Sequence, residues 1–243
     1  MKQGIFEIAE NRMIAKNTYL CVLKGDVSDI TASGQFINIK LDGFFLRRPI
    51  SVCDVNADSV TIIYKVVGQG TEVMANMSKG EKLDVLTGLG NGYDLSKSGD
   101  RPLLLGGGAG VPPMYMLCRL LIAQGKKPTV ILGFNAKDEV FFEDEFKALG
   151  ADVVVTTADG SYGEKGFVTD AMKRLDYTYF YTCGPEPMLK AIDKTAVTSG
   201  QLSFEERMGC GFGACMGCSC KTKYGNKRIC KDGPVLEREE IIW

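Results

Sequence analysis

Short runs of β-branched and aromatic residues recur through residues 1–98, separated by Gly, Asp and Asn. The clearest are YLCVLKG, QFINIKL, RPISVCDV, SVTIIYKVV and EKLDVLTGL. Runs of this length between turn-forming residues are typical of strands. About six of them, with no long helix between, predict a small antiparallel β-barrel.

The pattern changes over residues 99–200. The stretch RPLLLGGGAGVPPMYMLCRLLIAQG predicts a strand, a glycine-rich turn and a helix, and PTVILGF, ADVVVTTA and YTYFYTCG predict further strands with helical stretches between them. Such alternation favours a parallel sheet with helices on its faces. Residues 201–243 form a third, cysteine-rich segment, so we expect a multi-domain protein of β and α/β parts with a small C-terminal module.

Four cysteines of the last segment have the spacing C-x4-C-x2-C with a fourth further on; they are Cys210, Cys215, Cys218 and Cys230. This is the plant-type ferredoxin pattern for a [2Fe–2S] cluster. Neighbouring glycines suit a tightly wrapped loop. A structural zinc site is the alternative, although zinc loops usually pair two C-x2–4-C units. Cys220 is a fifth candidate, which we expect to be a small buried side chain rather than a ligand.

The chain contains 243 residues and no histidine. The absence of histidine excludes a Rieske cluster, His-containing zinc hydrolase sites and Ser–His dyads. Hydride and electron transfer through cofactors needs no such side chain.

The formal net charge of −1 gives no electrostatic reason to expect nucleic acid or an anionic membrane as a partner. No apolar stretch has the ~18 residues that span a bilayer, and the N-terminus lacks an apolar signal region. Nine cysteines without such a signal favour metal binding in a reducing compartment, so we expect a cytoplasmic protein.

Two short motifs in the barrel segment suit a flavin nucleotide. In Arg48-Pro49-Ile50-Ser51, the arginine could pair with a pyrophosphate and the serine hydroxyl with a flavin nitrogen. Gly70-Thr71 opens a predicted helix, whose N-terminus can hold an anion. Taken alone, each motif is more typical of a solvated strand edge or an ordinary helix cap than of a binding site.

Two motifs in the α/β segment suit a nicotinamide nucleotide. GGGAGVPPM, residues 106–114, stands between a strand and a helix, where backbone amides can approach a phosphate. Cys183-Gly184 ends a strand, and ligands of open α/β sheets bind outside such ends. A tight structural turn and a buried cysteine are the alternatives.

In this order, RPIS, GT, GGGAGVPPM and CGPEPM resemble the ferredoxin–NADP reductase superfamily. The added EERMGCGFGACMGCSCKT and RICKDGPVL resemble the electron-transfer subunits of class B dihydroorotate dehydrogenase. The resemblance covers nearly the whole chain. It implies FAD on a barrel of residues 1–98, NAD on an α/β domain of residues 99–200, and a [2Fe–2S] cluster on a module of residues 201–243.

The resemblance also implies the site residues. The flavin contacts would be Arg48, Pro49, Ile50, Ser51, Ile63, Tyr64 and Lys65, with the pyrophosphate at Gly70 and Thr71. The nicotinamide nucleotide would lie at Gly108, Gly110, Pro113, Cys183 and Gly184, and the cluster on Cys210, Cys215, Cys218 and Cys230. No residue is expected to act as an acid or base. Many reductases of this superfamily end in an aromatic that covers the flavin, but Trp243 follows an added module and we do not assign it that role. Acidic residues at 138 and 139 would repel a 2′-phosphate, which favours NAD over NADP.

The implied function is to pass electrons between NAD(H) and an FMN-bearing dihydroorotate dehydrogenase catalytic subunit in pyrimidine biosynthesis, with two copies of each subunit. Phe212, Met216 and residues 241–243 are candidates for the contact with that subunit, or for a small core under the loop. The alternatives are the small subunit of another flavin and iron–sulfur oxidoreductase (bifurcating ferredoxin:NADP type, hydrogenase or sulfite reductase) or a non-catalytic metal-binding adaptor.

Overall fold

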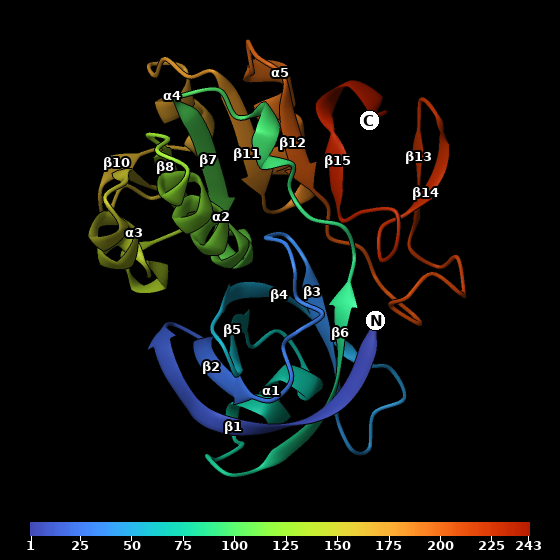
Figure 1. Ribbon diagram of the computed structural model, residues 1–243. Helices are drawn as coiled ribbons and strands as arrows, with labels where there is room; N and C mark the ends of the chain where they lie inside the picture. Colours follow the sequence, from blue (N-terminus) through green and yellow to red (C-terminus); the bar gives the residue numbers. More distant parts are fainter.

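Six antiparallel strands close into a barrel in the lower half of the molecule (Figure 1), and the computed structural model describes all 243 residues. The strand order is β1-β2-β5-β4-β3-β6. The strands are β1 (Lys2–Ala15), β2 (Thr18–Lys24), β3 (Phe36–Lys40), β4 (Arg48–Val55), β5 (Ser59–Lys65) and β6 (Lys82–Leu89). Helix α1 (Gln69–Ala75) contributes Met74 to the barrel core. The predicted barrel is confirmed.

Alternate side chains of the barrel strands serve two different cores. On β3, Ile37 and Ile39 point into the barrel core, whereas Phe36 belongs to a core outside it. On β4, Val52 points inward and Cys53 outward. This follows from the two-residue period of a strand, and it gives β3, β4 and β5 an outer face against the rest of the chain.

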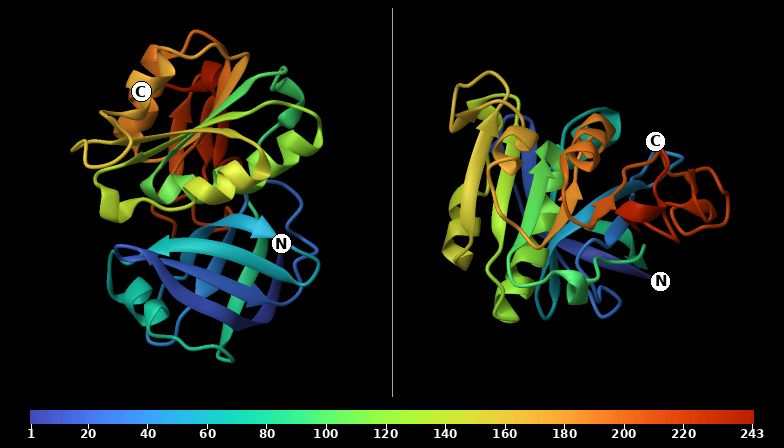
Figure 2. Two further views of the ribbon diagram at one scale, coloured as in Figure 1. Left: turned by 90° about the vertical axis from the view of Figure 1, so that its left-hand side faces the viewer. Right: turned by 90° about the horizontal axis from the view of Figure 1, so that it is seen from above.

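The upper half is a seven-stranded sheet of order β10-β9-β8-β7-β11-β12-β15. Its strands are β7 (Pro102–Gly107), β8 (Thr129–Phe134), β9 (Asp152–Thr157), β10 (Glu164–Lys165), β11 (Tyr179–Cys183), β12 (Gly200–Ser203) and β15 (Val235–Glu237). All pairs are parallel except β12 with β15. The helices are α2 (Val111–Ala123), α3 (Glu143–Leu149), α4 (Val168–Met172) and α5 (Glu186–Thr195). The sheet with helices on both faces confirms the predicted α/β part (Figure 2).

Four 3-10 turns complete the elements: η1 (Leu95–Lys97), η2 (Gly108–Gly110), η3 (Lys137–Glu139) and η4 (Arg238–Glu240). The C-terminal module carries a hairpin of β13 (Ser219–Thr222) and β14 (Gly225–Arg228). The chain then returns through β15 to the edge of the large sheet. The domain limits near residues 98 and 200 stay a prediction.

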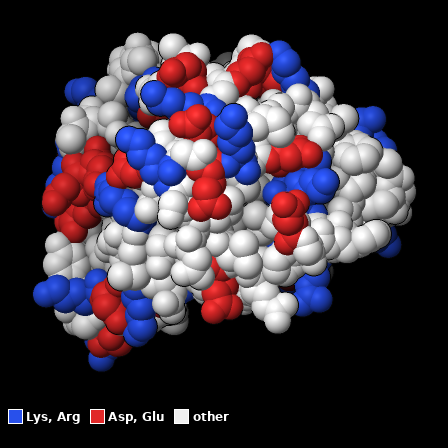
Figure 3. Space-filling view, turned by 90° about the horizontal axis from the view of Figure 1, so that it is seen from below, with Lys and Arg blue, Asp and Glu red and all other residues white.

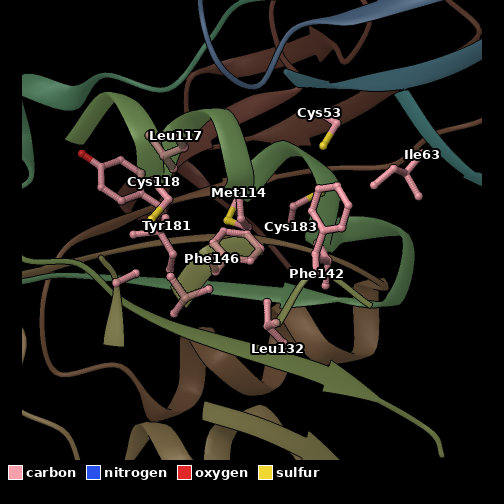
Figure 4. Close-up of a cluster of buried hydrophobic side chains, with 14 of the residues drawn as sticks. Cys53, Ile63, Met114, Leu117, Cys118, Leu132, Phe142, Phe146, Tyr181 and Cys183 are labelled. Carbon is pink, nitrogen blue, oxygen red and sulfur yellow. The ribbon is translucent and has the colours of Figure 1, made fainter. Parts of the chain in front are cut away.

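The barrel and the α/β part share one hydrophobic core (Figure 4). Cys53 and Ile63 of the barrel belong to the same cluster as Met114, Leu117 and Cys118 of α2. At the edge of this contact, the Arg119 guanidinium lies 2.6 Å from the Asp54 carboxylate. We expect the two parts to move little against each other, because a packed apolar core opposes sliding.

Seen from below, the surface carries acidic and basic side chains intermixed rather than gathered by sign (Figure 3). No helix has the length and apolarity that a bilayer span requires.

Candidate functional site

A cavity of about 660 Å³ opens at the carboxyl ends of the central parallel strands. Gly107 ends β7, Asn135 follows β8, Thr156 is the next-to-last residue of β9 and Pro185 lies two residues beyond β11, and all four line it. Strand β7 has β8 on one side and β11 on the other, so the chain turns to opposite sides here. Such a switch point is where open α/β sheets bind nucleotides.

The two glycine motifs predicted for the nicotinamide nucleotide meet beside this cavity. A Cβ on Gly110 would lie 2.1 Å from the carbonyl oxygen of Cys183 and 2.6 Å from the nitrogen of Gly184. Gly108, at φ +51°, lines the cavity and has open space above it. Pro113 is buried in the first turn of α2 and Cys183 is buried under Gly110, so these two do not line the cavity. Burial raises the pKa of the Cys183 thiol.

One polar atom of the cavity wall has no partner in the protein. The Oγ1 atom of Thr156 is buried and makes no hydrogen bond. Native proteins rarely leave such atoms unsatisfied, so the wall fits a polar ligand such as a dinucleotide. Thr156 was not among the predicted site residues, although its place near the end of the strand-like run ADVVVTT was a usable signal.

Glu205 also lines the cavity and was missed. Its side chain opens into the hollow, where solvent reaches it, yet the surrounding protein still raises its pKa by desolvation. No motif marks this residue, because it stands between β12 and the cysteine loop with no turn or glycine signature of its own.

Lys65 connects the barrel to the cavity. Its Nζ lies 2.9 Å from Oε1 of Glu139, and both side chains line the cavity. Burial opposes ionisation of Glu139, but hydrogen bonds from Lys65 and Asn135 outweigh it and lower the pKa of Glu139. Ile63, Tyr64 and Lys65 also share a narrow crevice with Gly108. The segments predicted for flavin and for nicotinamide are therefore adjacent.

Arg48 lies against Gly70, as the two barrel motifs would require. A Cβ on Gly70 would fall 2.2 Å from Nε of Arg48, and the guanidinium lies 4.7 Å from the ring centre of Phe44. The only acceptor of Arg48 is the carbonyl of Leu46. A cation without a carboxylate partner, in a cradle that any larger side chain would fill, fits a phosphate ligand.

Thr71 and Tyr64 have structural partners of their own. The Oγ1 atom of Thr71 accepts from the backbone nitrogens of Val67 at 3.0 Å and Gly68 at 3.3 Å. The hydroxyl of Tyr64 donates to Oδ1 of Asn11 at 3.0 Å, and its ring stacks on Tyr19. Both side chains are held by these contacts within the protein, and their contact with the flavin stays a prediction.

Replacing Arg48 with alanine is expected to raise the dissociation constant for FAD about ten- to a hundredfold, since a charge-assisted hydrogen bond contributes about 1.5–3 kcal/mol. Titration of the apo-chain with FAD, followed by flavin fluorescence, measures it. Arg101→Ala removes an exposed arginine paired with Asp176 and serves as the control. Equal affinity in both variants would remove Arg48 from the flavin site.

The four predicted ligand cysteines associate two by two. Sγ of Cys210 accepts from the nitrogen of Cys215 at 3.4 Å, and Sγ of Cys215 accepts from the nitrogen of Cys210 at 3.4 Å. Sγ of Cys218 accepts from the nitrogen of Cys230 at 3.4 Å. No three Cys, Asp or Glu side chains of the chain surround one point where a single ion could bind. Two thiol pairs fit a cluster of two irons better than one zinc ion.

The two pairs differ in environment. Burial acts against the Cys210 thiolate, but hydrogen bonds from the nitrogens of Phe212, Cys215 and Ala214 lower its pKa to about 6. Burial raises the pKa of Cys230 to about 12, and its contact with Cys218 adds to the shift. Cys210 is therefore more easily ionised than Cys230, and a thiolate is the form that binds metal.

Cys220 lies on β13, packed against the core that contains Ile229 and Ile241. Burial raises the pKa of its thiol. Replacing Cys220 with serine is expected to leave the visible and EPR spectra of the cluster unchanged, because the four other cysteines complete the ligand set. A lost spectrum in this variant, with Cys218→Ser tolerated, would exchange the roles of the two residues.

The C-terminal residues predicted for a partner contact differ in exposure. Phe212 is 43% exposed and Met216 53% exposed, whereas Ile241 is 8% exposed and belongs to the core. Trp243 is hydrogen-bonded to α5, because its Nε1 donates to Oδ2 of Asp193 at 2.7 Å. Phe212 and Met216 are the exposed pair on the cysteine loop, whereas Ile242 and Trp243, 46% and 40% exposed, lie outside this loop at the end of the chain.

Two family models match the chain. Residues 205–242 match the iron–sulfur cluster binding domain of dihydroorotate dehydrogenase B, and residues 104–194 match the oxidoreductase NAD-binding domain. The predicted resemblance is confirmed in both segments.

Curated relatives extend the match to the full chain. The electron transfer subunit of dihydroorotate dehydrogenase B (NAD(+)) from Fusobacterium nucleatum is 48% identical, over 96% of each chain. The subunit of the same name from Bacillus pumilus is 44% identical, over 99% of this chain and 98% of the relative.

Solved structures share the fold. A structure of the NADH-dependent reduced ferredoxin-NADP oxidoreductase, described for flavin-based electron bifurcation, is 30% identical with a TM-score of 0.90, covering 99% of this chain and 90% of the other. The cytochrome b5 reductase domain of Ulva prolifera nitrate reductase, 18% identical, aligns with a TM-score of 0.67 over 84% of this chain and 97% of that domain. The latter likeness concerns the fold alone.

Proposed function

The chain belongs to the family of electron transfer subunits of dihydroorotate dehydrogenase B (NAD(+)), and from this premise we propose that it carries electrons between NAD(H) and a catalytic subunit that oxidises dihydroorotate. It is an NAD-linked oxidoreductase subunit that uses FAD and a [2Fe–2S] cluster.

The observation that carries the proposal is the contiguity of the three candidate sites. Lys65 reaches from flavin strand β5 into the dinucleotide cavity. The outer face of the barrel also reaches the cysteine loop, because Asn38 of β3 contacts the carbonyl of Cys210. A barrel between the cavity and the thiol pairs suits a relay in which FAD exchanges a hydride for single electrons.

The residues of this chain bind the cofactors and hold them in place. Gly108 lets the backbone approach the dinucleotide, Gly110 lets the same loop pack against the end of β11, and Arg48 supplies the charge for a pyrophosphate. Backbone N–H groups that donate to Cys210 and Cys215 stabilise ligand thiolates and tune the potential of a metal site. None of these tasks needs a side chain that shuttles protons, which suits a chain without histidine.

A catalytic partner subunit is expected from the names of the relatives. The relatives are named as electron transfer subunits, which implies a catalytic subunit beside them. We propose that this subunit carries FMN, that two copies of each chain assemble, and that the complex serves pyrimidine biosynthesis in the cytoplasm. The exposed Phe212 and Met216 suit the contact, since Phe and Met are enriched at interfaces. Nine cysteines without a disulfide fit a reducing compartment.

Coexpression with a dihydroorotate dehydrogenase catalytic subunit tests the proposal. We expect a stable complex that reduces NAD with dihydroorotate, whereas this chain alone oxidises NADH only with artificial acceptors. Failure to associate, together with tight binding to a ferredoxin-linked partner, would move the chain to the bifurcating class that its 30% identical structural neighbour represents.

A further inference from the structure

One buried polar side chain of the barrel faces the cysteine loop. Asn38, in the middle of β3, is 1% exposed. Because Ile37 and Ile39 point into the barrel core, strand alternation turns Asn38 outward with Phe36. Phe36 packs in the same core as Cys218 and Cys230. A valine or isoleucine would suit such a position better, since a buried polar group destabilises the fold unless it is hydrogen-bonded.

The amide nitrogen of Asn38 holds the first predicted ligand residue. Its Nδ2 donates to the carbonyl of Cys210 in a long hydrogen bond of 3.4 Å, between residues 172 positions apart. A Cβ on Gly211, at φ +78°, would lie 2.3 Å from this Nδ2, so the loop touches Asn38 through a glycine. The backbone carbonyl of Asn38 accepts a hydrogen bond from Nη1 of Arg47 at 3.3 Å. This second contact holds the strand in place next to the cysteine loop.

The amide oxygen of Asn38 is left without a donor. Oδ1 is buried and makes no hydrogen bond. The reversed amide would point this oxygen at the Cys210 carbonyl and set two acceptors against each other. A buried atom of this kind in a native protein calls for a specific explanation.

The strand register places the Asn38 side chain on the same face of the sheet as two residues of the predicted flavin segment. Asn38 stands opposite Pro49 and Phe36 opposite Ser51 in the β3–β4 ladder. Residues directly opposite in a ladder share a face of the sheet. Pro49 and Ser51 belong to the predicted flavin segment, so Asn38 shares a face with this segment while its Nδ2 contacts Cys210.

We propose that Asn38 is a positioning residue that couples the flavin to the cluster. Its Nδ2 fixes the Cys210 peptide against the barrel, and its Oδ1 offers an acceptor on the flavin face. The inference rests on the proposed function, since it presumes that electrons cross from the barrel to the cysteine loop. It names the residue that keeps the two sites in fixed relation.

Two variants, Asn38→Leu and Asn38→Ala, remove the amide, and Thr87→Val is the matched control. Thr87 is a buried polar residue of the neighbouring strand β6, and its hydroxyl bonds the carbonyl of Lys2 rather than the cysteine loop. FAD, iron and sulfide contents are expected to stay at wild-type levels in all three, as is the rate at which NADH reduces the flavin.

The readouts are an EPR-monitored redox titration of the cluster and stopped-flow absorbance after mixing with NADH. We expect the cluster's one-electron equilibrium to shift about three- to tenfold toward the oxidised form in both Asn38 variants, because a neutral hydrogen bond beside a ligand is lost. Cluster reduction after flavin reduction should slow by about tenfold, as when reacting groups lose fixed alignment.

Wild-type potential and rate in both fully loaded Asn38 variants would overturn the inference. Loss of the cluster from both variants, with Thr87→Val fully loaded, would make Asn38 a structural residue and also overturn it. If NADH fails to reduce the cluster of the wild-type chain, the proposed function itself fails, so the two failures are distinguishable.

Discussion

Replacing Cys215 with serine is expected to abolish the [2Fe–2S] cluster, with iron and acid-labile sulfide falling to near zero per chain. Cys215 is exposed, and its Sγ accepts from the nitrogens of Cys210 and Gly217. A serine hydroxyl is a poor substitute for a thiolate, and one missing ligand leaves an iron open to solvent. Metal and sulfide analysis with the visible spectrum measures the loss.

The same variant distinguishes the function of the cluster from that of the flavin. NADH-to-dye activity should survive in part, because Arg48, Gly70 and the dinucleotide cavity lie outside the cysteine loop. Cys220→Ser is the matched control, five residues further along the chain. A full complement of iron and sulfide in Cys215→Ser would contradict the assignment of this cysteine, and zinc without sulfide in the wild-type chain would contradict the cluster itself.

Replacing Gly110 with alanine is expected to weaken NADH binding about 5- to 150-fold, which corresponds to the 1–3 kcal/mol that overpacking costs. The new Cβ would meet backbone atoms of Cys183 and Gly184 at 2.1–2.6 Å, and backbone cannot turn aside as a flexible side chain can. The loop after β7 must therefore move away from the end of β11, where the cavity lies. The KM for NADH in the dye assay and the thermal midpoint report the effect.

Gly4→Ala provides the comparison for Gly110→Ala. Its Cβ would meet only the Phe6 ring, at 3.4 Å, which is an ordinary contact. We expect wild-type KM and a nearly unchanged midpoint for this variant. Unchanged NADH binding in Gly110→Ala would show that the contact between the two strand ends does not shape the nucleotide site.

The elements that local pattern determines could be predicted from the sequence. The β-branched runs of residues 1–98 became barrel strands, and the fully buried Leu103, Leu104 and Leu105 became a central parallel strand, because each pattern matches the period of its element. Strand β15 was not predicted. It has three residues, and only its pairing with β12 makes it a strand.

The candidate site also has one part that could be predicted from the sequence and one part that could not. The glycine and cysteine motifs could be found because turns and ligand spacings are local, and the resemblance then supplied their roles. The contacts between the motifs could not be predicted from the sequence. Lys65 meets Glu139 across 74 positions and Asn38 meets Cys210 across 172. No local pattern encodes such pairs, since packing of the barrel against the rest of the chain creates them.

The most direct test of the electron route is anaerobic reduction of the cluster from each end, followed by EPR. In the coexpressed complex, we predict that NADH and dihydroorotate each produce the signal of the reduced cluster. In this chain alone, NADH should produce it and dihydroorotate should not. A cluster that NADH cannot reduce in the FAD-loaded chain, or that dihydroorotate cannot reduce in the complex, would contradict the account.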